Sequence, residues 1–165
     1  MVDPAHLLEL ARREINHSPR GAPRQSELCR AVSTAYYAAF HGLMAEVAAT
    51  FATVNQPVTR ILFYRGLEHG KTRERCNRLS REPLADLDRG FFGRSAFAPE
   101  LQLFSNAFVA LQEALHLADY DPAYRVSRAE ARDWVDRAEE ALQNLHNAEI
   151  NEKSEFLAYL LLGRR

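Results

Sequence analysis

Residues 30–47, with the sequence RAVSTAYYAAFHGLMAEV, carry apolar side chains on almost every side of a helix. Large apolar residues recur there at spacings of three and four, which is the period of one broad helical stripe. Five alanines add small side chains that let neighbouring helices approach closely. The pattern predicts a central helix over about residues 26–52, closed by the Asn55-Gln56-Pro57 cluster.

The polar atoms on this apolar helix need partners wherever they are buried. They belong to Ser33, Thr34, Tyr36, Tyr37 and His41. His41 has two interpretations, because a histidine on an apolar helix belongs either to a site or to a core in which a neighbour satisfies it.

The remaining periodic segments also predict helices, and no segment alternates as a strand does. Asp3 and Pro4 form a helix start, and the 18–23 segment ends that helix with two prolines and a glycine. Further helices are predicted near residues 58–67, 73–80, 99–118, 127–145 and 156–162. We therefore expect an all-α chain of about five or six helices that form a single-domain up-and-down bundle. The domain covers residues 1–165, with its core at about 3–145 and a C-terminal helical extension at 146–165.

Two segments between these helices lack a clear period. Residues 69–72, His-Gly-Lys-Thr, predict a break or bend, and residues 81–98 predict an irregular excursion that exposes Phe91 and Phe92.

Ser127 with Glu130 forms a capping box for the last long helix. Trp134 is the large side chain expected to anchor that helix in the core.

Composition and charge argue against several classes of protein. A net charge of −1 and a pI near 6.6 give no global argument for nucleic acid or for an anionic membrane. The two cysteines form no CxxC pair, so no metal and no cofactor is expected. The N-terminus has no signal pattern, and the apolar run at 156–162 is too short to span a membrane. We expect a cytoplasmic protein with no membrane partner.

The middle of the chain is locally basic. Residues 60–94 contain nine basic and five acidic side chains, an excess of four. Arg73, Arg75 and Arg78 could hold phosphates, while Tyr37 and Tyr120 could stack on bases, which indicates nucleic-acid binding. The alternative is a solvated face whose arginines pair with acidic neighbours such as Glu74 and Glu82, or with the acidic helix of another copy.

Arg65 and His69 are four residues apart, a spacing that places two side chains on one helical face. Such a pair could set an imidazole general base beside a cation that stabilises a phosphate. It is equally what two surface residues look like. The chain contains no Gly-rich phosphate loop, HExxH or GxSxG motif.

The segment 30–41, RAVSTAYYAAFH, resembles the second helix of the HEPN superfamily (higher eukaryotes and prokaryotes nucleotide-binding domain). Residues 69–72 with the following basic helix resemble a mid-domain element of that family. Residues 115–122, LHLADYDP, with the helix start at 127–130, resemble its Ala-Asp-Tyr-Asp variant and final helix. The resemblance implies a helical bundle that usually forms a homodimer. It also implies RNA or nucleotide binding, and a minimal nucleotidyltransferase as partner in a toxin–antitoxin pair.

Ribonucleases of that family carry an arginine, four to six residues, and then a histidine that is commonly followed by tyrosine. On this chain the position of the histidine falls on Asp119, just before Tyr120, and that of the arginine falls on residues 112–114. An aspartate supplies no imidazolium near neutral pH. We therefore expect a binding or partner module with an eroded catalytic motif. In the alternative reading, residues 119–122 only stop the helix, with Asp121 capping a turn and Tyr120 packed on the bundle.

Two rival functions follow from the same residues. One is a metal-independent ribonuclease with a rearranged site, in which His116, His69 or His41 is the base and Arg65 or Arg128 holds the phosphate. The other is a structural oligomer whose basic middle segment meets the acidic last helices of another copy. Salt would dissociate such an oligomer.

Overall fold

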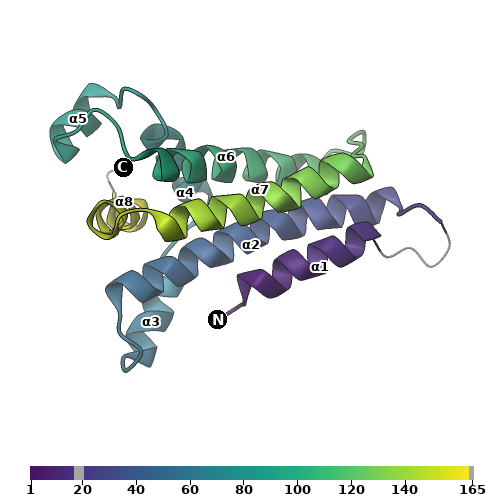
Figure 1. The fold of residues 1–165 in the computed structure, drawn as a ribbon, viewed down its shortest axis with the longest axis horizontal. Coiled ribbons are helices and arrows are strands. Elements are labelled where there is room, and N and C mark those ends of the chain that lie inside the picture. The colour runs from purple at the N-terminus through teal and green to yellow at the C-terminus, as the bar shows by residue number, and fades with distance from the viewer. Residues whose placement is uncertain (17–20, 164–165) are drawn as a thin grey trace.

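The computed structural model describes residues 1–16 and 21–163, which form eight helices and no strand (Figure 1). The all-α class is confirmed, but the described residues contain eight helices rather than five or six. The helices are α1 (Pro4–Asn16), α2 (Gln25–Phe51), α3 (Pro57–Tyr64), α4 (His69–Leu79), α5 (Asp86–Phe92), α6 (Pro99–Tyr120), α7 (Arg128–Asn147) and α8 (Ile150–Leu162).

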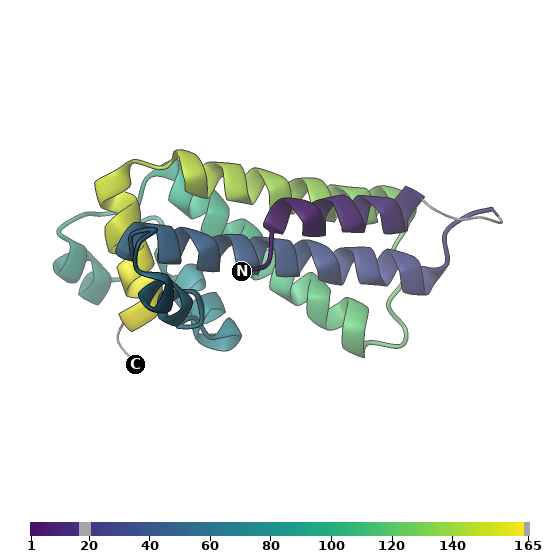
Figure 2. The same ribbon diagram turned by 90° about the horizontal axis from the view of Figure 1, so that it is seen from below.

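Helix α2 lies at the centre, and α1, α6 and α7 pack around it (Figures 1 and 2). Most of its alanines are fully buried, so the three neighbours approach its backbone closely. Gly42 permits one such approach, because a Cβ atom at this position would lie 2.3 Å from Cδ2 of Leu142 on α7. The apolar stretch at residues 30–47 thus forms the core helix that its pattern predicts.

Helix α1 starts where Asp3 and Pro4 predict, and the Asp3 carboxylate accepts a hydrogen bond from the Ala5 amide at 3.0 Å. The helix runs antiparallel to α2 (Figure 1). The predicted turn at 18–23 lies partly outside the described residues. Helix α2 spans 25–51, within one residue of the prediction at each end.

Four shorter helices, α3, α4, α5 and α8, gather at one end of the bundle (Figure 1). Helix α8 turns away from the line of α7 and crosses this end (Figure 2). Phe156 of α8 is fully buried against Phe97 and Phe104, so the last helix contributes to the core. None of the described helices is long and apolar enough to cross a bilayer.

The prediction of a break at residues 69–72 is wrong, because His69 begins α4. The chain bends earlier, in the 65–68 segment. The irregular excursion predicted at 81–98 instead contains α5. The carboxylates of Asp86 and Asp88 in its first turn interact favourably with the positive end of the helix dipole. Gly93 ends the helix in the left-handed conformation, at φ 66°.

Two predictions about side chains near the end of the chain have different outcomes. The capping box is confirmed, since Ser127 Oγ accepts from the Glu130 amide and Glu130 accepts from the Ser127 amide. Trp134 is only half-buried, with the Arg137 guanidinium 4.8 Å from its ring centroid, so it is not the main anchor of α7. The largest fully buried side chains of the described residues instead include Tyr36, Phe97, Phe104, Phe108 and Phe156.

Candidate functional site

The candidate site lies along one face of α2. Ser33, Tyr37 and His41 follow one another at four-residue spacing, which places them in one row. At 1.5 Å per residue, Ser33 and His41 are about 12 Å apart along the helix. Tyr37 is 41 % exposed in the middle of this row, so its ring is open to a ligand.

His69, the first residue of α4, is bound to this face by Tyr36. The Tyr36 hydroxyl lies 2.6 Å from His69 Nδ1. Tyr36 is fully buried, and this burial raises the pKa of its hydroxyl far above the usual range, so the oxygen keeps its proton. The hydroxyl therefore donates to Nδ1 of the neutral imidazole, and this assignment leaves the ring proton of His69 on Nε2.

Phe40 holds the His69 ring from its other side. The two rings are stacked with their centroids 3.8 Å apart. The Tyr37 ring meets His69 edge to face at 6.3 Å. The imidazole of an otherwise exposed residue is thus fixed in position by three side chains of α2.

His41 forms a second pair of the same kind, with Tyr64 of α3. Its Nδ1 lies 2.7 Å from the Tyr64 hydroxyl, which also accepts a hydrogen bond from the Val2 amide at 3.1 Å. The hydroxyl oxygen can accept a second hydrogen bond besides the one from Val2, so His41 Nδ1 either accepts the hydroxyl proton or donates its own, according to the tautomer. The two pairs are reciprocal, since α2 supplies the tyrosine in one pair and the histidine in the other.

Both histidines are held neutral. Partial burial lowers the pKa of His69 below its ordinary value of 6.5. Partial burial also lowers the pKa of His41, and the charge that His69 gains on protonation lowers it further. Near pH 7 both imidazoles are therefore neutral, each with one donor and one acceptor nitrogen.

Arg65 directly follows Tyr64, but it does not share a helical face with His69. It caps the C-terminus of α3, and a turn separates it from α4, so the predicted common face is wrong. Its side chain is exposed and makes no hydrogen bond or ion pair with the residues that the structure describes. We call Tyr37, His41 and His69 the His–Tyr surface; Arg65 lies in the turn between Tyr64 and His69.

The Asp119 region is at the other end of the same α2 row. Ser33 Oγ donates a hydrogen bond to the Asp119 carboxylate, which ties the end of α6 to α2. The rings of His116 and Tyr120 are 5.8 Å apart, and both residues are exposed. Because Asp119 is bonded to Ser33, it lies about two helical turns from His41, so His41 and Asp119 do not share one cluster.

The prediction of a helix stop at residues 119–122 has a different outcome for Asp121 and for Tyr120. The Asp121 carboxylate accepts from the Ala123 amide at 2.8 Å just after α6 ends, as a turn-capping aspartate does. Tyr120 is 75 % exposed, so the prediction that it packs on the bundle is wrong.

The three arginines predicted to bind nucleic acid all have partners within the chain. Arg73 pairs with Glu113 of α6 at 2.5 Å. Arg75 donates to the carbonyls of Leu160 and Gly163, at 2.6 and 2.5 Å, at the end of α8. None of these partners is Glu74 or Glu82, the neighbours expected from helical spacing.

Arg78 binds a buried carboxylate. It binds Asp88 of α5 at 2.7 Å, and the Asp88 side chain is 4 % exposed. Asp88 also accepts from the Tyr159 hydroxyl of α8 at 3.2 Å. Arg75 and Arg78 therefore fasten α4 to α5 and α8.

Arg128 is fixed elsewhere, because its Nε donates to the Ile15 carbonyl at the end of α1, 3.0 Å away. Of the two arginines expected to hold a phosphate, Arg65 therefore has the free side chain. Within residues 1–16 and 21–163, no group of three or more His, Cys, Asp or Glu side chains could hold a metal ion.

Sequence reasoning identified the two histidines and the need of the Tyr36 hydroxyl for a partner, but not that Tyr36 pairs with His69, and it missed the role of Tyr64. Tyr64 occupies a position in an apolar stripe, which indicates a packed ring and says nothing about its hydroxyl. The signal that could have found them is the need of a half-buried histidine for a partner at Nδ1.

Together the fold and the site define a class, an all-helical bundle with two tyrosine-held histidines on and beside its central helix. No family model matches the chain, and no protein of curated function and no solved structure is significantly similar to it.

Proposed function

We propose that this chain is a HEPN-like helical module that binds single-stranded RNA or a nucleotide on its His–Tyr surface, and that it acts as a homodimer. The observation that carries the proposal is the fixed His69 ring beside the exposed Tyr37 ring, with centroids 6.3 Å apart. An exposed ring stacks on a base, while imidazole N–H and guanidinium groups bind phosphate oxygens.

The binding site proposed here replaces the arginine strip expected from the sequence. Arg75 and Arg78 already bind other parts of the chain, so using them for RNA would cost those contacts. Arg65 has no such partner among the described residues, and it lies in the turn that leads to His69. A ligand bound there would be short, a mononucleotide or a small part of an RNA strand.

Fluorescence anisotropy with short labelled RNAs and mononucleotides tests this proposal. Tyr37→Ala and Arg65→Ala are expected to weaken binding, by about 1–3 kcal/mol for the stacking residue. Arg13→Ala is the matched control, since Arg13 is exposed on α1 and pairs with the exposed Glu9. If neither RNA nor nucleotide binds and no protein co-purifies, the proposal is wrong.

A second candidate is a metal-independent ribonuclease with a rearranged site. The observation that favours it is the His41–Tyr64 pair, because in the tautomer in which His41 Nδ1–H donates to the Tyr64 oxygen, Nε2 of His41 carries no proton and can act as a base. One imidazole would take the proton of a ribose 2′-hydroxyl, whose oxygen attacks the adjacent phosphorus. The bond to the 5′-oxygen then breaks, and that oxygen takes a proton from water.

Cleavage in the presence of EDTA tests the second candidate. Activity that is lost in His69→Ala or His41→Ala but kept in His116→Ala assigns the base to the His–Tyr surface. Activity that survives all three substitutions rules these histidines out as the base.

The resemblance to HEPN proteins also suggests the setting of a toxin–antitoxin pair, with a minimal nucleotidyltransferase as the partner. Co-expression with the product of the adjacent gene, followed by purification of the complex, tests this. A partner that fails to co-purify counts against that setting and leaves RNA binding to its own test.

A further inference from the structure

Helix α4 buries little apolar surface. The structure describes all eleven of its residues, and three of them are buried: Thr72, Cys76 and Leu79. Leu79 is the one large apolar side chain among the three. Buried apolar area is the main term that holds a helix against its neighbours, so packing holds α4 only weakly.

The contact between α4 and α6 also contains unpaired polar atoms. Thr72 Oγ1, Ser105 Oγ and Gln112 Oε1 are buried, and none of them has a hydrogen-bond partner among the described residues. Ser105 lies beside the buried Cys76 thiol, and a thiol is a weak donor. We call the contact formed by Thr72, Cys76, Ser105 and Gln112 the α4–α6 seam.

The spacing of these residues places them along one seam. Thr72 and Cys76 are four residues apart, which is one face of α4. Ser105 and Gln112 are seven residues apart, which is one face of α6. Because Cys76 meets Ser105, both faces point into the contact between the two helices.

Closing the seam costs free energy. A buried hydroxyl or amide oxygen without a partner has lost its hydrogen bonds to water and has gained none in the protein. When α4 separates from α6, water reaches these atoms and restores their hydrogen bonds. The polar seam therefore opens more readily than an apolar contact of the same size.

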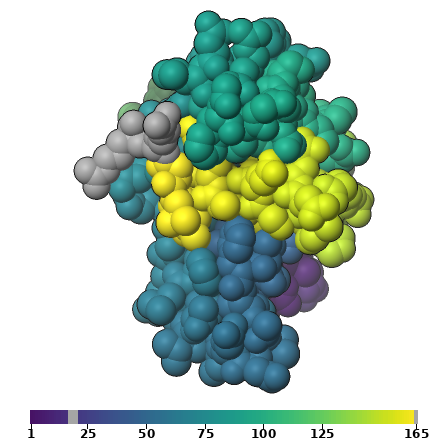
Figure 3. All heavy atoms as spheres, turned by 90° about the vertical axis from the view of Figure 1, so that its left-hand side faces the viewer, coloured from purple at the N-terminus to yellow at the C-terminus, as the bar shows by residue number. Residues whose placement is uncertain are grey.

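Contacts at the edges of α4 hold the seam closed. The Tyr36 hydroxyl of α2 binds His69, at the start of α4, at 2.6 Å. Arg73 pairs with Glu113 of α6 at 2.5 Å, and both side chains are half-exposed, so this ion pair is weak. Two arginines on the other side of α4 bind α5 and α8, which lie together at this end of the molecule (Figure 3).

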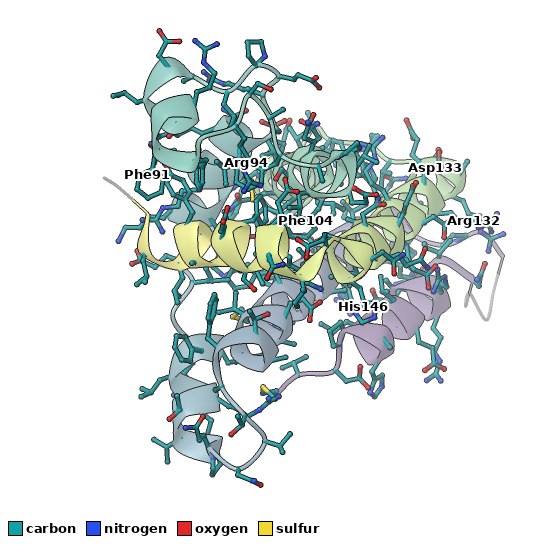
Figure 4. All side chains as sticks on the ribbon, turned by 60° about the vertical axis from the view of Figure 1, so that its left-hand side comes forward. Phe91, Arg94, Phe104, Arg132, Asp133 and His146 are labelled. Atoms are coloured by element: carbon teal, nitrogen blue, oxygen red, sulfur yellow. The ribbon has the colours of Figure 1, made fainter. Side chains whose placement is uncertain are left out.

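Helix α6, in contrast, is firmly packed. Its Phe104 and Phe108 side chains are fully buried. Phe104 contacts Phe156 of α8 and Phe108 contacts Tyr36 of α2, with ring centroids 6.1 and 5.6 Å apart. Figure 4 shows Phe104 inside the bundle, close to α8. Helix α6 is therefore held in place by contacts that do not involve α4.

We propose that α4 is a lid that opens from α6 in the folded protein and carries His69 away from α2, so that the His–Tyr surface is assembled only in the closed state. His69 is the first residue of α4, so its ring leaves Tyr36 and Phe40 when the helix moves. Tyr37 and His41 stay on α2. The lid needs no ligand, whereas its control of ligand binding rests on the function proposed above.

The buried Cys76 thiol reports the opening. Burial raises the pKa of this thiol to about 12, so it does not react with Ellman's reagent in the closed protein. Cys29, the other cysteine of the sequence, is replaced by serine so that Cys76 is the one thiol labelled. The labelling rate, relative to that of the urea-unfolded chain, gives the open fraction.

The open fraction is compared with the unfolded fraction that urea denaturation gives for the same protein. We expect the open fraction to be about tenfold or more the larger, because a local opening costs less than global unfolding. Equal fractions would mean that Cys76 is exposed only when the whole protein unfolds. That result overturns the lid.

Breaking a contact at the edge of α4 should open the lid. Arg73→Ala removes the ion pair with α6 and should raise the labelling rate about twofold. Tyr36→Phe removes the donor to His69 and should raise it about fivefold. Arg13→Ala is the control, because it removes an exposed ion pair within α1. If neither Arg73→Ala nor Tyr36→Phe changes the rate, a different movement exposes Cys76 and the lid is wrong.

Removing an unpaired oxygen from the seam should hold the lid closed. Thr72→Val keeps a similar shape without the buried hydroxyl, so labelling should slow by about fivefold. Thr34→Val is the matched control and should not slow labelling, because the Thr34 hydroxyl has a partner, Glu14 of α1, at 3.5 Å. Gln112→Met repeats the test on α6 if Thr72→Val does not fold. Faster labelling in Thr72→Val would show that the closed seam already satisfies the hydroxyl, and would overturn the proposal.

A short oligoadenylate tests whether the lid controls the His–Tyr surface. An RNA bound there holds His69 against α2, so it should slow Cys76 labelling in step with its saturation in the anisotropy measurement. Binding that leaves the labelling rate unchanged overturns the control of the site by the lid. Absence of binding counts against the proposed function, and labelling of the free protein still decides whether the lid exists.

Discussion

The hydroxyl of Tyr36, on the buried side of α2, lies 2.6 Å from Nδ1 of His69, the first residue of α4. This hydrogen bond joins the core helix to the start of a surface helix. It fixes the orientation of the imidazole, and the buried tyrosine contributes nothing else polar to the site. The bond therefore makes the site depend on the core.

Tyr36→Phe tests that dependence. The variant keeps the buried ring but removes the donor to His69, and it should lose about 1 kcal/mol of unfolding free energy. Urea denaturation measures the change. Tyr37→Phe is the matched control, because the hydroxyl of that half-exposed side chain has no partner among the described residues. Equal losses in the two variants would contradict the assigned role of Tyr36.

The lowered pKa values of His41 and His69 predict how stability depends on pH. In the unfolded chain each histidine has a pKa near 6.5, and in the folded chain it has a lower one. Between those values the unfolded chain binds more protons, so the free energy of unfolding rises with pH. It should therefore fall as the pH drops below 6.5. Denaturation curves at a series of pH values measure this.

Removing the histidines provides the control for the pH effect. In a His41→Gln/His69→Gln variant the pH dependence between about 6.5 and 5 should be shallower than in the unaltered chain. An unchanged slope would assign the effect to carboxylates elsewhere in the protein.

Arg78→Met should destabilise the protein strongly. The substitution removes the cation and leaves the buried Asp88 carboxylate without its main partner. Breaking a buried ion pair in this way costs about 3 kcal/mol or more, which urea denaturation can measure. The Arg78→Met/Asp88→Asn double variant should recover part of the loss, because the asparagine side chain carries no charge. Arg89→Ala, which removes an exposed pair with Asp86, should change stability by less than about 1 kcal/mol.

Two glycines in helices should respond differently to alanine. Gly70, in the first turn of α4, has open space where a Cβ would lie, so Gly70→Ala should gain about 0.5–1 kcal/mol. Gly42→Ala places its Cβ 2.3 Å from Leu142 Cδ2, and Leu142 must move. It should be less stable than Gly70→Ala by about 1 kcal/mol or more. Thermal melting of the two variants side by side measures the difference.

The long helices could be predicted from the sequence because their apolar periods are strong. Helix α2 was located within one residue at each end, and the Ser127 capping box was correct. The short helices were less accessible, because α5 has only seven residues and is held by Arg78 and Tyr159 from other helices. A local pattern carries no information about such distant partners.

The same reason limited the prediction of the site. His41 was identified because a polar residue on an apolar helix is conspicuous, and His69 because of its spacing from Arg65, although the shared face expected from that spacing is wrong. Their partners were not, because Tyr64 reaches His41 from a different helix and Tyr36 reaches His69 across 33 residues. For Arg75 and Arg78 the sequence offers either phosphates or nearby acids such as Glu74 and Glu82 as partners, and only tertiary structure shows that α8 and Asp88 bind them.

The arginines of α4 also join the short helices at this end of the molecule. Arg75 holds the last carbonyls of α8, and Arg78 holds Asp88, which in turn accepts from Tyr159 of α8. Helices α4, α5 and α8 are thereby joined by polar contacts that break together. Their backbone amides are expected to exchange with deuterium as one cooperative unit, at a lower free energy than those of α2. A ligand that steadies His69 would then slow exchange in α8, a helix that the proposed ligand does not contact.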